Sequence, residues 1–442
     1  MNFFKRIKKA GRDFEIKKLA QKEFERRYSY PVLKKENWQV KEKLKEATSK
    51  NLELIRKAPH RPEGISYYED IISGDKREKE LQKFSGKIIG SFCIFTPEEL
   101  IHSACAIPVR LCAGAYDTIS IAEEVLPRDI CPLVKSSFGF KVARFSYFEL
   151  CDAVISPTPC DDKKKLGEIL SNYLPVWSLR LPQSKEIGHS QEYWLREIRI
   201  LKERIEQLTC NKITKKSLKE SIRILHKRQE VLRRFYELRK NNPPLINGRD
   251  ALLVIQTGFY DDINRWIEKT QKLCDELEER KSNNKLPLSN CRLLLTGAPI
   301  IWPNYKLLNI IEEMQSTIVI DELCSGTRHF YDPVEVNEWT MDGMLQAIAN
   351  RYLLPSSCPC FTESDDRIDK ILQSAEDFKV NGVIHHSLRL CPLYDMELPK
   401  VSRVFKDKGI PFLAIHTDYS LEDIEQIRTR VEAFLEMLRS RT

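Results

Sequence analysis

Short apolar runs alternate with amphipathic segments in two parts of the chain. The runs of strand length are 87–92, 107–112 and 153–156 in the first part, and 292–296, 317–321, 382–386 and 411–415 in the second. Capped, helix-like segments follow most of them. Strands that alternate with helices are typical of a parallel sheet covered by helices. We therefore predict an α/β fold with two parallel-sheet domains.

Two further segments have a helical pattern. Residues 1–86 are polar and predict a helical N-terminal arm. Residues 189–247 are highly charged, and their apolar positions recur at helical spacing, which predicts a helical insertion with one buried face. These positions are Trp194, Ile198, Leu201, Ile205 and Leu208. The predicted domains are thus an arm (1–86), a first α/β domain (87–188), a charged helical segment (189–247) and a second α/β domain (248–442).

Composition narrows the class of protein. The 442 residues are 42% hydrophobic and 31% charged, which is usual for a globular protein of roughly two or three packed units. Membrane spans need about 18 consecutive apolar residues, and we expect none here. The first 28 residues lack the apolar core of a secretory signal, so we expect a cytoplasmic protein. The net charge of +8 is spread among acids without a recognition motif, so we expect no nucleic-acid partner.

The chain contains thirteen cysteines. An odd number in a large chain without a secretory signal favours metal binding or catalysis over a disulfide framework. Several follow predicted strands, where open α/β sheets bind ligands. Cys93, for example, lies between a strand and a helix start at Thr96, which we expect to cap the helix. The candidates in turns or loops are Cys93, Cys131, Cys160, Cys324, Cys358, Cys360 and Cys391, and their intervals are similar in the two halves.

The other cysteines lie within apolar or helical patterns, where a small buried residue is the usual role. These are Cys105, Cys112, Cys151, Cys210, Cys274 and Cys291. Zinc is a competing metal, but the chain has no CxxC pair and no Cys/His set at finger spacing. Adjacent His385 and His386 point to opposite faces of a strand, so at most one can join a site, and we expect structural roles for both.

Seven stretches, in one order from residue 87 to the C-terminus, resemble the 2-hydroxyacyl-CoA dehydratase and benzoyl-CoA reductase family, most of all its double-cubane cluster proteins. They are CIFTPEELIHSACAIPVRLCAG, VLPRDICPLVKSSFGF, DAVISPTPCDDKKKLGEIL, LLLTGAPI, VIDELCSGTR, VNGVIHHSLRLCPLYDMELP and GIPFLAIHTDYSLEDIEQIRTRVEAFLEML. The resemblance implies two Rossmann- or flavodoxin-like domains with an iron-sulfur cluster in the crevice between them.

The resemblance also implies the ligands. The dehydratase pattern places Cys131, Cys160 and Cys391 on one 4Fe-4S cluster. Cys93, Cys324 and the Cys358/Cys360 pair provide a second set of thiols in similar loops, and either member of that pair can be the sixth ligand. Six suitable thiols are what the double-cubane branch implies, with an 8Fe-9S cluster made of two four-iron units bridged by a sulfide.

The resemblance also concerns the source of electrons. The family's low-potential chemistry is coupled to ATP hydrolysis, yet this chain has neither a P-loop nor a GxGxxG fingerprint. The resemblance implies a separate ATP-dependent iron-sulfur activator that docks and delivers electrons for reduction of a small-molecule substrate. Residues expected near the cluster are Lys135, Ser136, Ser137 and Arg328. Lys135 and Arg328 would place positive charge there, with surface salt bridges as the alternative role. No catalytic proton donor is identified.

The sequence is also compatible with two other functions. One alternative is a dehydratase or acyl-CoA reductase subunit with a single 4Fe-4S cluster, paired with a related chain as a heterodimer. Another is a non-catalytic α/β scaffold, either zinc-stabilised or metal-free. Near the C-terminus, an apolar stripe from Ile424 to Leu438 predicts an amphipathic helix that either packs on its own domain or contributes to a homodimer interface, which the resemblance favours.

Overall fold

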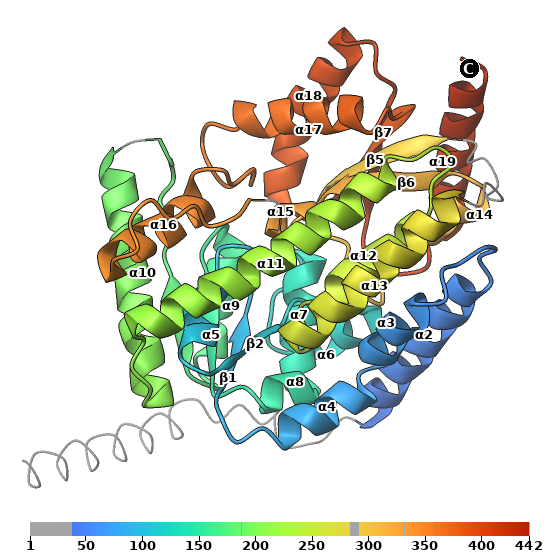
Figure 1. The fold of residues 1–442 in the computed structure, drawn as a ribbon. Helices are drawn as coiled ribbons and strands as arrows, with labels where there is room; N and C mark the ends of the chain where they lie inside the picture. Colours follow the sequence, from blue (N-terminus) through green and yellow to red (C-terminus); the bar gives the residue numbers. More distant parts are fainter. Residues whose placement is uncertain (1–37, 187, 283–290, 331, 442) are drawn as a thin grey trace, which may run out of the picture.

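Two parallel sheets of four strands lie at the centre of the molecule (Figure 1). The computed structural model describes residues 38–441 except 187, 283–290 and 331. The first sheet has the order β2-β1-β3-β4, the second has the order β6-β5-β7-β8, and all pairs are parallel. The strands are β1 (Ile88–Ser91), β2 (Ile107–Arg110), β3 (Ala153–Pro157), β4 (Val176–Leu179), β5 (Arg292–Gly297), β6 (Thr317–Glu322), β7 (Gly382–Leu388) and β8 (Phe412–Thr417).

The predicted α/β fold is confirmed. Each of the seven predicted strands overlaps an observed one, and β4 is the strand that the prediction missed. Strands β5, β6 and β7 are buried along their whole length, as expected when helices cover both faces of a parallel sheet. In each sheet the strand order reverses next to the first strand, between β1 and β3 and between β5 and β7. Ligands of open α/β sheets bind at such points, at the carboxyl ends of the strands.

The helices surround these sheets and connect them. Those before and within the first unit are α2 (Trp38–Arg56), α3 (Ile65–Ser73), α4 (Asp75–Gln82), α5 (Glu98–Ser103), η2 (Tyr116–Thr118), α6 (Ile119–Ala122), α7 (Pro132–Val142), α8 (Ser146–Glu149) and α9 (Asp161–Leu170). The later ones are α10 (Gly188–Thr209), α11 (Lys215–Arg239), α12 (Gly248–Thr257), α13 (Ile263–Ser282), α14 (Lys306–Glu313), α15 (Thr327–Phe330), α16 (Met341–Leu353), α17 (Asp365–Asp377), α18 (Pro392–Asp407) and α19 (Ile424–Arg439).

Helix α11 joins the two units. In Figure 1 it crosses the molecule from α10 to the second sheet. Its first half contributes Leu218 and Ile222 to the hydrophobic core around the first sheet, and its second half contributes Leu232 and Phe235 to the core around the second. Loops of the two units also touch directly, because Gly114 lies so close to Ile301 that a Cβ on it would be 2.1 Å from the Ile301 carbonyl oxygen. The two units therefore pack as one body around their shared loops.

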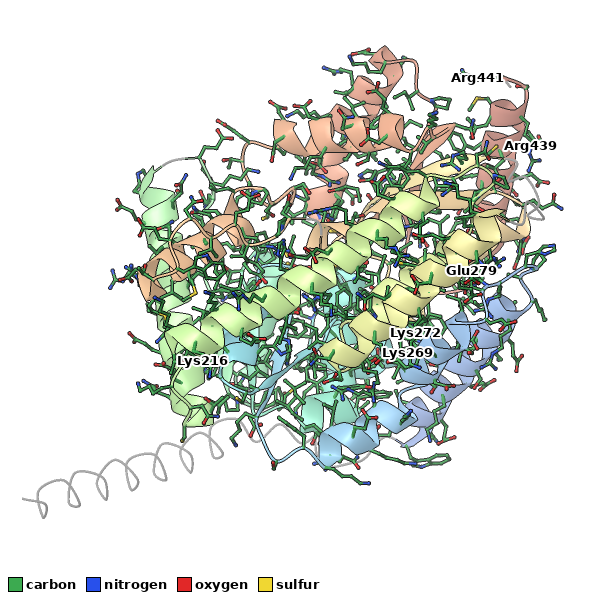
Figure 2. All side chains as sticks on the ribbon, in the orientation of Figure 1. Lys216, Lys269, Lys272, Glu279, Arg439 and Arg441 are labelled. Carbon is green, nitrogen blue, oxygen red and sulfur yellow. The ribbon has the colours of Figure 1, made fainter. Side chains whose placement is uncertain are left out.

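The N-terminal arm and the charged helical segment are helical, as predicted, in the residues that the structure describes. Predicted arm residues 1–37 lie outside the described residues, and the rest forms α2, α3 and α4, with Ile55, Ile65 and Tyr68 in the second core. In α10, Trp194, Ile198, Leu201 and Ile205 are buried. Charged side chains of both signs cover α11 and α13, among them Lys216, Lys269, Lys272 and Glu279 (Figure 2). Every helix in the described part of the chain is too short or too polar to cross a lipid bilayer.

The C-terminal apolar stripe lies against its own domain. Ile427, Val431, Phe434, Leu435 and Leu438 of α19 are buried in the second core, and Ile424 packs against it. Intramolecular packing, the first of the two expected roles, is therefore confirmed. The suggestion that this stripe contributes to a homodimer interface is wrong, because its side chains are already covered within the chain.

Candidate cysteine-lined site

Eight cysteines line a single cavity of about 1230 Å³ at the meeting point of the two units. They include all the cysteines predicted from turns or loops, together with one that was not predicted. The lining cysteines are Cys93, Cys112, Cys131, Cys160, Cys324, Cys358, Cys360 and Cys391, and none forms a disulfide. The cavity is larger than the roughly 300–1000 Å³ of ordinary small-ligand pockets.

The topology explains this convergence. Cys93, Cys112 and Cys160 follow strands β1, β2 and β3 of the first sheet, while Cys324 and Cys391 follow β6 and β7 of the second. The carboxyl ends of both sheets therefore face the same space. The remaining cysteines come from loops: Cys131 precedes α7, and Cys358 and Cys360 lie between α16 and α17.

Three of the cysteines are at helix N-termini. Cys131, Cys160 and Cys391 immediately precede α7, α9 and α18, which are 11, 10 and 16 residues long. Each thiol accepts from backbone N–H groups of the first turn, for example those of Leu133 and Val134 at Cys131. Free N–H groups and the positive end of the helix dipole stabilise negative charge. We call these three residues the Cys131 group.

Two thiols of the Cys131 group are joined by a hydrogen bond. The Cys391 thiol donates a hydrogen bond to Cys131, which lowers the pKa of Cys131 and raises that of Cys391. Burial raises the pKa of Cys160 to about 11, partly offset by the Lys163 backbone N–H. An electropositive ligand would favour the ionised form of all three thiols.

Cys93, Cys324 and Cys358 form a second set, the Cys93 group. Burial raises the pKa of Cys93 to about 12, and the proximity of Cys324 and Cys358 adds to this rise. Hydrogen bonding from the Cys360 thiol, together with the charge of Arg328, lowers the pKa of Cys358 to about 7. Cys360 is close to both groups, since Cys358, Cys93 and Cys160 all raise its pKa.

The backbone at Cys93 is unusual. Its φ is +64°, in the left-handed region that non-glycine residues rarely adopt. Its carbonyl accepts a hydrogen bond from the buried guanidinium of Arg110. The predicted Thr96 cap is wrong: α5 begins only at Glu98, and the Thr96 hydroxyl donates to the Phe92 carbonyl, 3.3 Å away. These contacts hold the β1–α5 turn so that Cys93 lines the cavity.

Cys112 was predicted to be a core residue, and the structure corrects this assignment. The residue is buried, but β2 ends at Arg110, so Cys112 lies in the following turn and lines the cavity. Burial alone would raise its pKa, but the nearby charges of Lys163 and Arg110 outweigh this effect and lower it. An apolar run that appeared to extend to residue 112 hid the end of the strand.

Lys163 was missed by the sequence analysis. Its ammonium lies 3.4 Å from the Cys112 sulfur and 5.3 Å from the centre of the Phe92 ring, and only 8% of the residue is exposed. Cys112, Cys93 and Cys324 raise its pKa despite the burial. One signal was available, because Lys163 shares the buried face of α9 with Leu166, Gly167 and Leu170.

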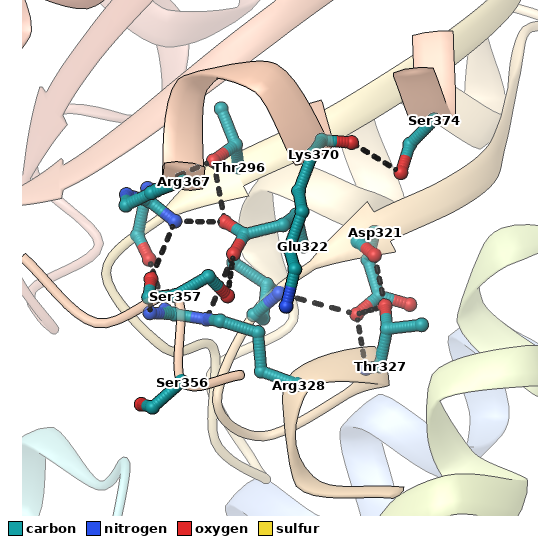
Figure 3. A network of polar contacts seen from close by, with 12 residues as sticks. Thr296, Asp321, Glu322, Thr327, Arg328, Ser356, Ser357, Arg367, Lys370 and Ser374 are labelled. Atoms are coloured by element: carbon teal, nitrogen blue, oxygen red, sulfur yellow. Dashed lines mark hydrogen bonds and ion pairs between the residues drawn. The ribbon is translucent and has the colours of Figure 1, made fainter. Parts of the chain in front are cut away.

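Arg328 belongs to a buried polar network next to the Cys93 group (Figure 3). It donates to the carbonyl of Ser357 (3.1 Å), to that of Gly297 (3.3 Å) and to the Tyr394 hydroxyl (2.6 Å). Burial raises the pKa of Cys324, and the charge of Arg328 partly offsets this rise. The same charge contributes to the lowered pKa of Cys358. Arg328 therefore lies near the site as predicted, although it does not line the cavity.

Lys135 and the two serines lie elsewhere. The Lys135 ammonium is 2.8 Å from a Glu123 carboxylate oxygen and 2.8 Å from the Arg128 carbonyl, so its charge is used there and not at the cavity. The hydroxyls of Ser137 and Ser136 accept from the backbone N–H groups of Ala113 and Ala115. Lys135 thus matches the alternative salt-bridge role, and the serines support the loop that follows Cys112.

The other five cysteines and the pair His385 and His386 do not line the cavity. Cys274 and Cys291 are buried as predicted, and Cys151 is half-buried. Cys105 and Cys210 are exposed, contrary to the core assignment, because each lies in a turn with positive φ after a helix. His385 and His386 are buried in β7, and neither lines the cavity. In the described residues, no three His, Cys, Asp or Glu side chains are arranged around one metal-ion position.

Comparison with known proteins adds to this geometry. Residues 93–438 match the model of the family described as 2-hydroxyglutaryl-CoA dehydratase, D-component. The chain belongs to this family. It is 34% identical to the putative dehydratase subunit YjiM of Escherichia coli (strain K12), over 79% of this chain and 91% of YjiM. The family resemblance inferred from the seven stretches is therefore confirmed.

More distant relatives are matched over nearly their whole lengths. The (R)-phenyllactyl-CoA dehydratase beta subunit of Clostridium sporogenes is 26% identical, over 84% of this chain and 97% of that protein. A benzoyl-CoA reductase subunit of Thauera aromatica is 22% identical, over 84% of this chain and 96% of that protein. The relatives are dehydratase and reductase subunits, and this chain is an enzyme of the same family.

Proposed function

We propose that this chain is an iron-sulfur reductase that holds a double-cubane 8Fe-9S cluster in the cysteine-lined cavity and reduces a small molecule. The observation that carries the proposal is the convergence of all the predicted cysteines on one cavity, in two groups of three with Cys360 between them. A single cubane needs no more than one such group. When bound, the cluster supplies electrons one at a time at low potential.

The residues present fit such a cluster. Thiolates are the usual protein ligands of iron-sulfur clusters, and hydrogen bonds and local charge tune their potentials. The Cys131 group would hold one half, and Cys93, Cys324 and Cys358 the other. Cys358 is favoured over Cys360, because hydrogen bonding and the Arg328 charge already lower its pKa to about 7. Cys360 then acts as the hydrogen-bond donor to the Cys358 sulfur.

The scattered arrangement of sulfurs also argues against zinc. Structural zinc sites bring four ligands around one ion, and the described residues contain no such grouping. Sulfurs that surround a cavity match a ligand of several atoms better. The three helix N-termini and the buried cations Lys163 and Arg328 would offset its negative charge.

Iron and sulfide content per chain tests the proposal. After anaerobic reconstitution and removal of unbound iron, we expect about eight irons per chain, as the two thiol groups require. About four irons would favour the alternative, a dehydratase or acyl-CoA reductase subunit with one 4Fe-4S cluster. Absence of iron would overturn both.

Reduction is expected to need a partner. The chain has no recognisable phosphate-binding loop, so we propose that a separate ATP-dependent iron-sulfur activator delivers the electrons. Turnover should stop when the activator is omitted, even with ATP and a mild chemical reductant present. Full-rate turnover with the mild reductant alone would contradict this prediction. Nucleotide-binding measurements on the isolated chain provide the control, with weak or no binding expected.

We also propose that the chain works with a second polypeptide. The relatives are themselves named as subunits of dehydratases and of a reductase, which indicates assemblies of several chains. A homodimer fits a double-cubane protein, and a heterodimer fits the single-cluster alternative. The buried stripe of α19 does not provide this interface. The mass of the purified chain by light scattering tests the proposal, and a persistent monomer would contradict the homodimer.

A further inference from the structure

The two cysteine groups lie in different electrostatic surroundings. Lys163 is buried among the sulfurs, with its ammonium 3.4 Å from Cys112. Of the thiols, Cys112 acts on it most strongly, followed by Cys93 and Cys324, and then by Cys160. Cys112 belongs to neither group, and among the members of the two groups the charge acts more on Cys93 and Cys324 than on Cys160. The burial is substantial, so water screens this charge little.

Arg328 adds a second buried charge on the same side. It lies four residues after Cys324 in the same turn, and its guanidinium bonds the carbonyl of Ser357, next to Cys358. The residue is 8% exposed. Figure 3 shows how Glu322 and the loop at Ser357 hold the Arg328 side chain in place. Two of the three sulfurs of the Cys93 group therefore have a fixed guanidinium nearby.

The Cys131 group has an acidic neighbour instead. A carboxylate oxygen of Asp162 accepts from the Cys131 backbone N–H at 2.9 Å. The charge of Asp162 opposes ionisation of both thiols: it adds to the raised pKa of Cys160 and partly offsets the lowered pKa of Cys131. Helix N-termini supply partial positive charges of about half a unit each at this group. The Cys93 group instead has two buried cations nearby, Lys163 and Arg328, of which Arg328 is paired with Glu322 at 3.3 Å.

We propose that Lys163 and Arg328 make the half-site of Cys93, Cys324 and Cys358 the more easily reduced of the two, so that the first electron is held there. This inference rests on the proposed double-cubane cluster. In the step, one electron arrives from a low-potential one-electron donor, no bond forms or breaks, and the site gains one negative charge. A buried cation stabilises the more negative state, and a nearby carboxylate destabilises it.

The test is a potentiometric titration of the reconstituted full-length chain, followed by electron paramagnetic resonance, with dithionite as the donor. Lys163→Met is expected to lower the reduced-to-oxidised ratio of the first one-electron step at least tenfold at a fixed potential, which is about 59 mV. Lys163→Arg keeps the charge and should stay within about threefold of wild type. Lys163→Gln replaces the Met variant if that protein does not load iron.

Two further variants separate local charge from general damage. Lys165→Met removes a lysine from the same helix whose side chain is 65% exposed and paired with Glu168, and it should leave both steps unchanged. Asp162→Asn should make the second step easier and leave the first nearly unaffected, an effect of opposite sign at the other half-site.

Each outcome decides between the proposals. Equal shifts of both steps in Lys163→Met, or no shift beyond that of Lys165→Met, would overturn the assignment of the first electron. A wild-type chain with about four irons, or none, would instead overturn the double-cubane premise, and the inference with it. Iron content is measured on the same samples, so the two failures are distinguishable.

Discussion

Replacement of Cys131 by Ala is expected to reduce bound iron from about eight to about four or fewer per chain, because the half-cluster held by the Cys131 group loses one of its three thiolates. Cys160→Ala and Cys391→Ala should have the same effect, since all three sulfurs belong to one group at helix N-termini. Iron and sulfide analysis of reconstituted, desalted protein measures the loss.

The matched control is Cys210→Ala. Cys210 is exposed and outside the cavity, so its removal costs neither packing nor a ligand. Iron retained in Cys131→Ala but lost in Cys210→Ala would refute the ligand assignment. Cys358→Ala, in the Cys93 group, should lose iron. Cys112→Ala should retain it, because Cys112 belongs to neither group and is paired with Lys163.

Local sequence signals were sufficient to predict the strands and turns that position the cysteines of this site. Strands that are buried on both faces appear as continuous apolar runs, and helix-start residues mark where the chain turns. A cysteine between two such signals, such as Cys160 between β3 and α9, is therefore placed at a sheet edge by sequence alone. Because parallel strands end on the same side, the prediction that these thiols converge follows from topology.

Errors arose where a boundary of one or two residues changed the role of a side chain. Cys112 was assigned to a strand that ends two residues earlier. Cys105 was assigned to the core, but it lies in a turn where its side chain is exposed. Lys163 was not singled out, although α9 turns it toward the cavity. Charge runs specify a surface only when the helix phase is known, and that phase depends on where α9 begins.

The polar network next to the site could not be predicted from the sequence, for a different reason. Arg367 bonds side chains that are 30 to 71 residues away in the chain, on different elements. No local periodicity signals such contacts, which form only when β5, β6, α17 and α18 pack together. Buried ionic groups of this kind are visible in the folded structure and not in the pattern.

Arg367→Met is expected to destabilise the protein by about 3–5 kcal/mol, the usual cost of leaving a buried carboxylate without its cation. Arg367 is fully buried, and its Nε lies 3.0 and 2.9 Å from the two carboxylate oxygens of Glu397. It also bonds Glu322 and donates to the Ser357 carbonyl at 3.3 Å. After the substitution, Glu397 and Glu322 would remain buried with fewer partners.

The same change should weaken iron binding, because the network connects three cysteine-bearing elements. Figure 3 shows Arg367 with Glu322, which ends the strand before Cys324, and with Ser357, which precedes Cys358. Glu397 lies on the helix that begins after Cys391. Urea denaturation gives the loss of stability, and iron analysis gives the loss of cluster. Arg367→Lys keeps the charge but not the two-pronged geometry, so partial rescue is expected.

The control for this prediction is Arg199→Met, which removes an exposed ion pair. Arg199 lies 3.1 Å from Asp342, and the two side chains are 49% and 81% exposed. Surface pairs of this kind contribute about 0–1 kcal/mol, and neither residue of this pair lines the cavity. If Arg367→Met were no more destabilising than Arg199→Met and kept its iron, the network would have no role in holding Cys324, Cys358 and Cys391 in place. A loss of iron at unchanged stability would instead assign Arg367 to the cluster alone, through its charge near Cys358.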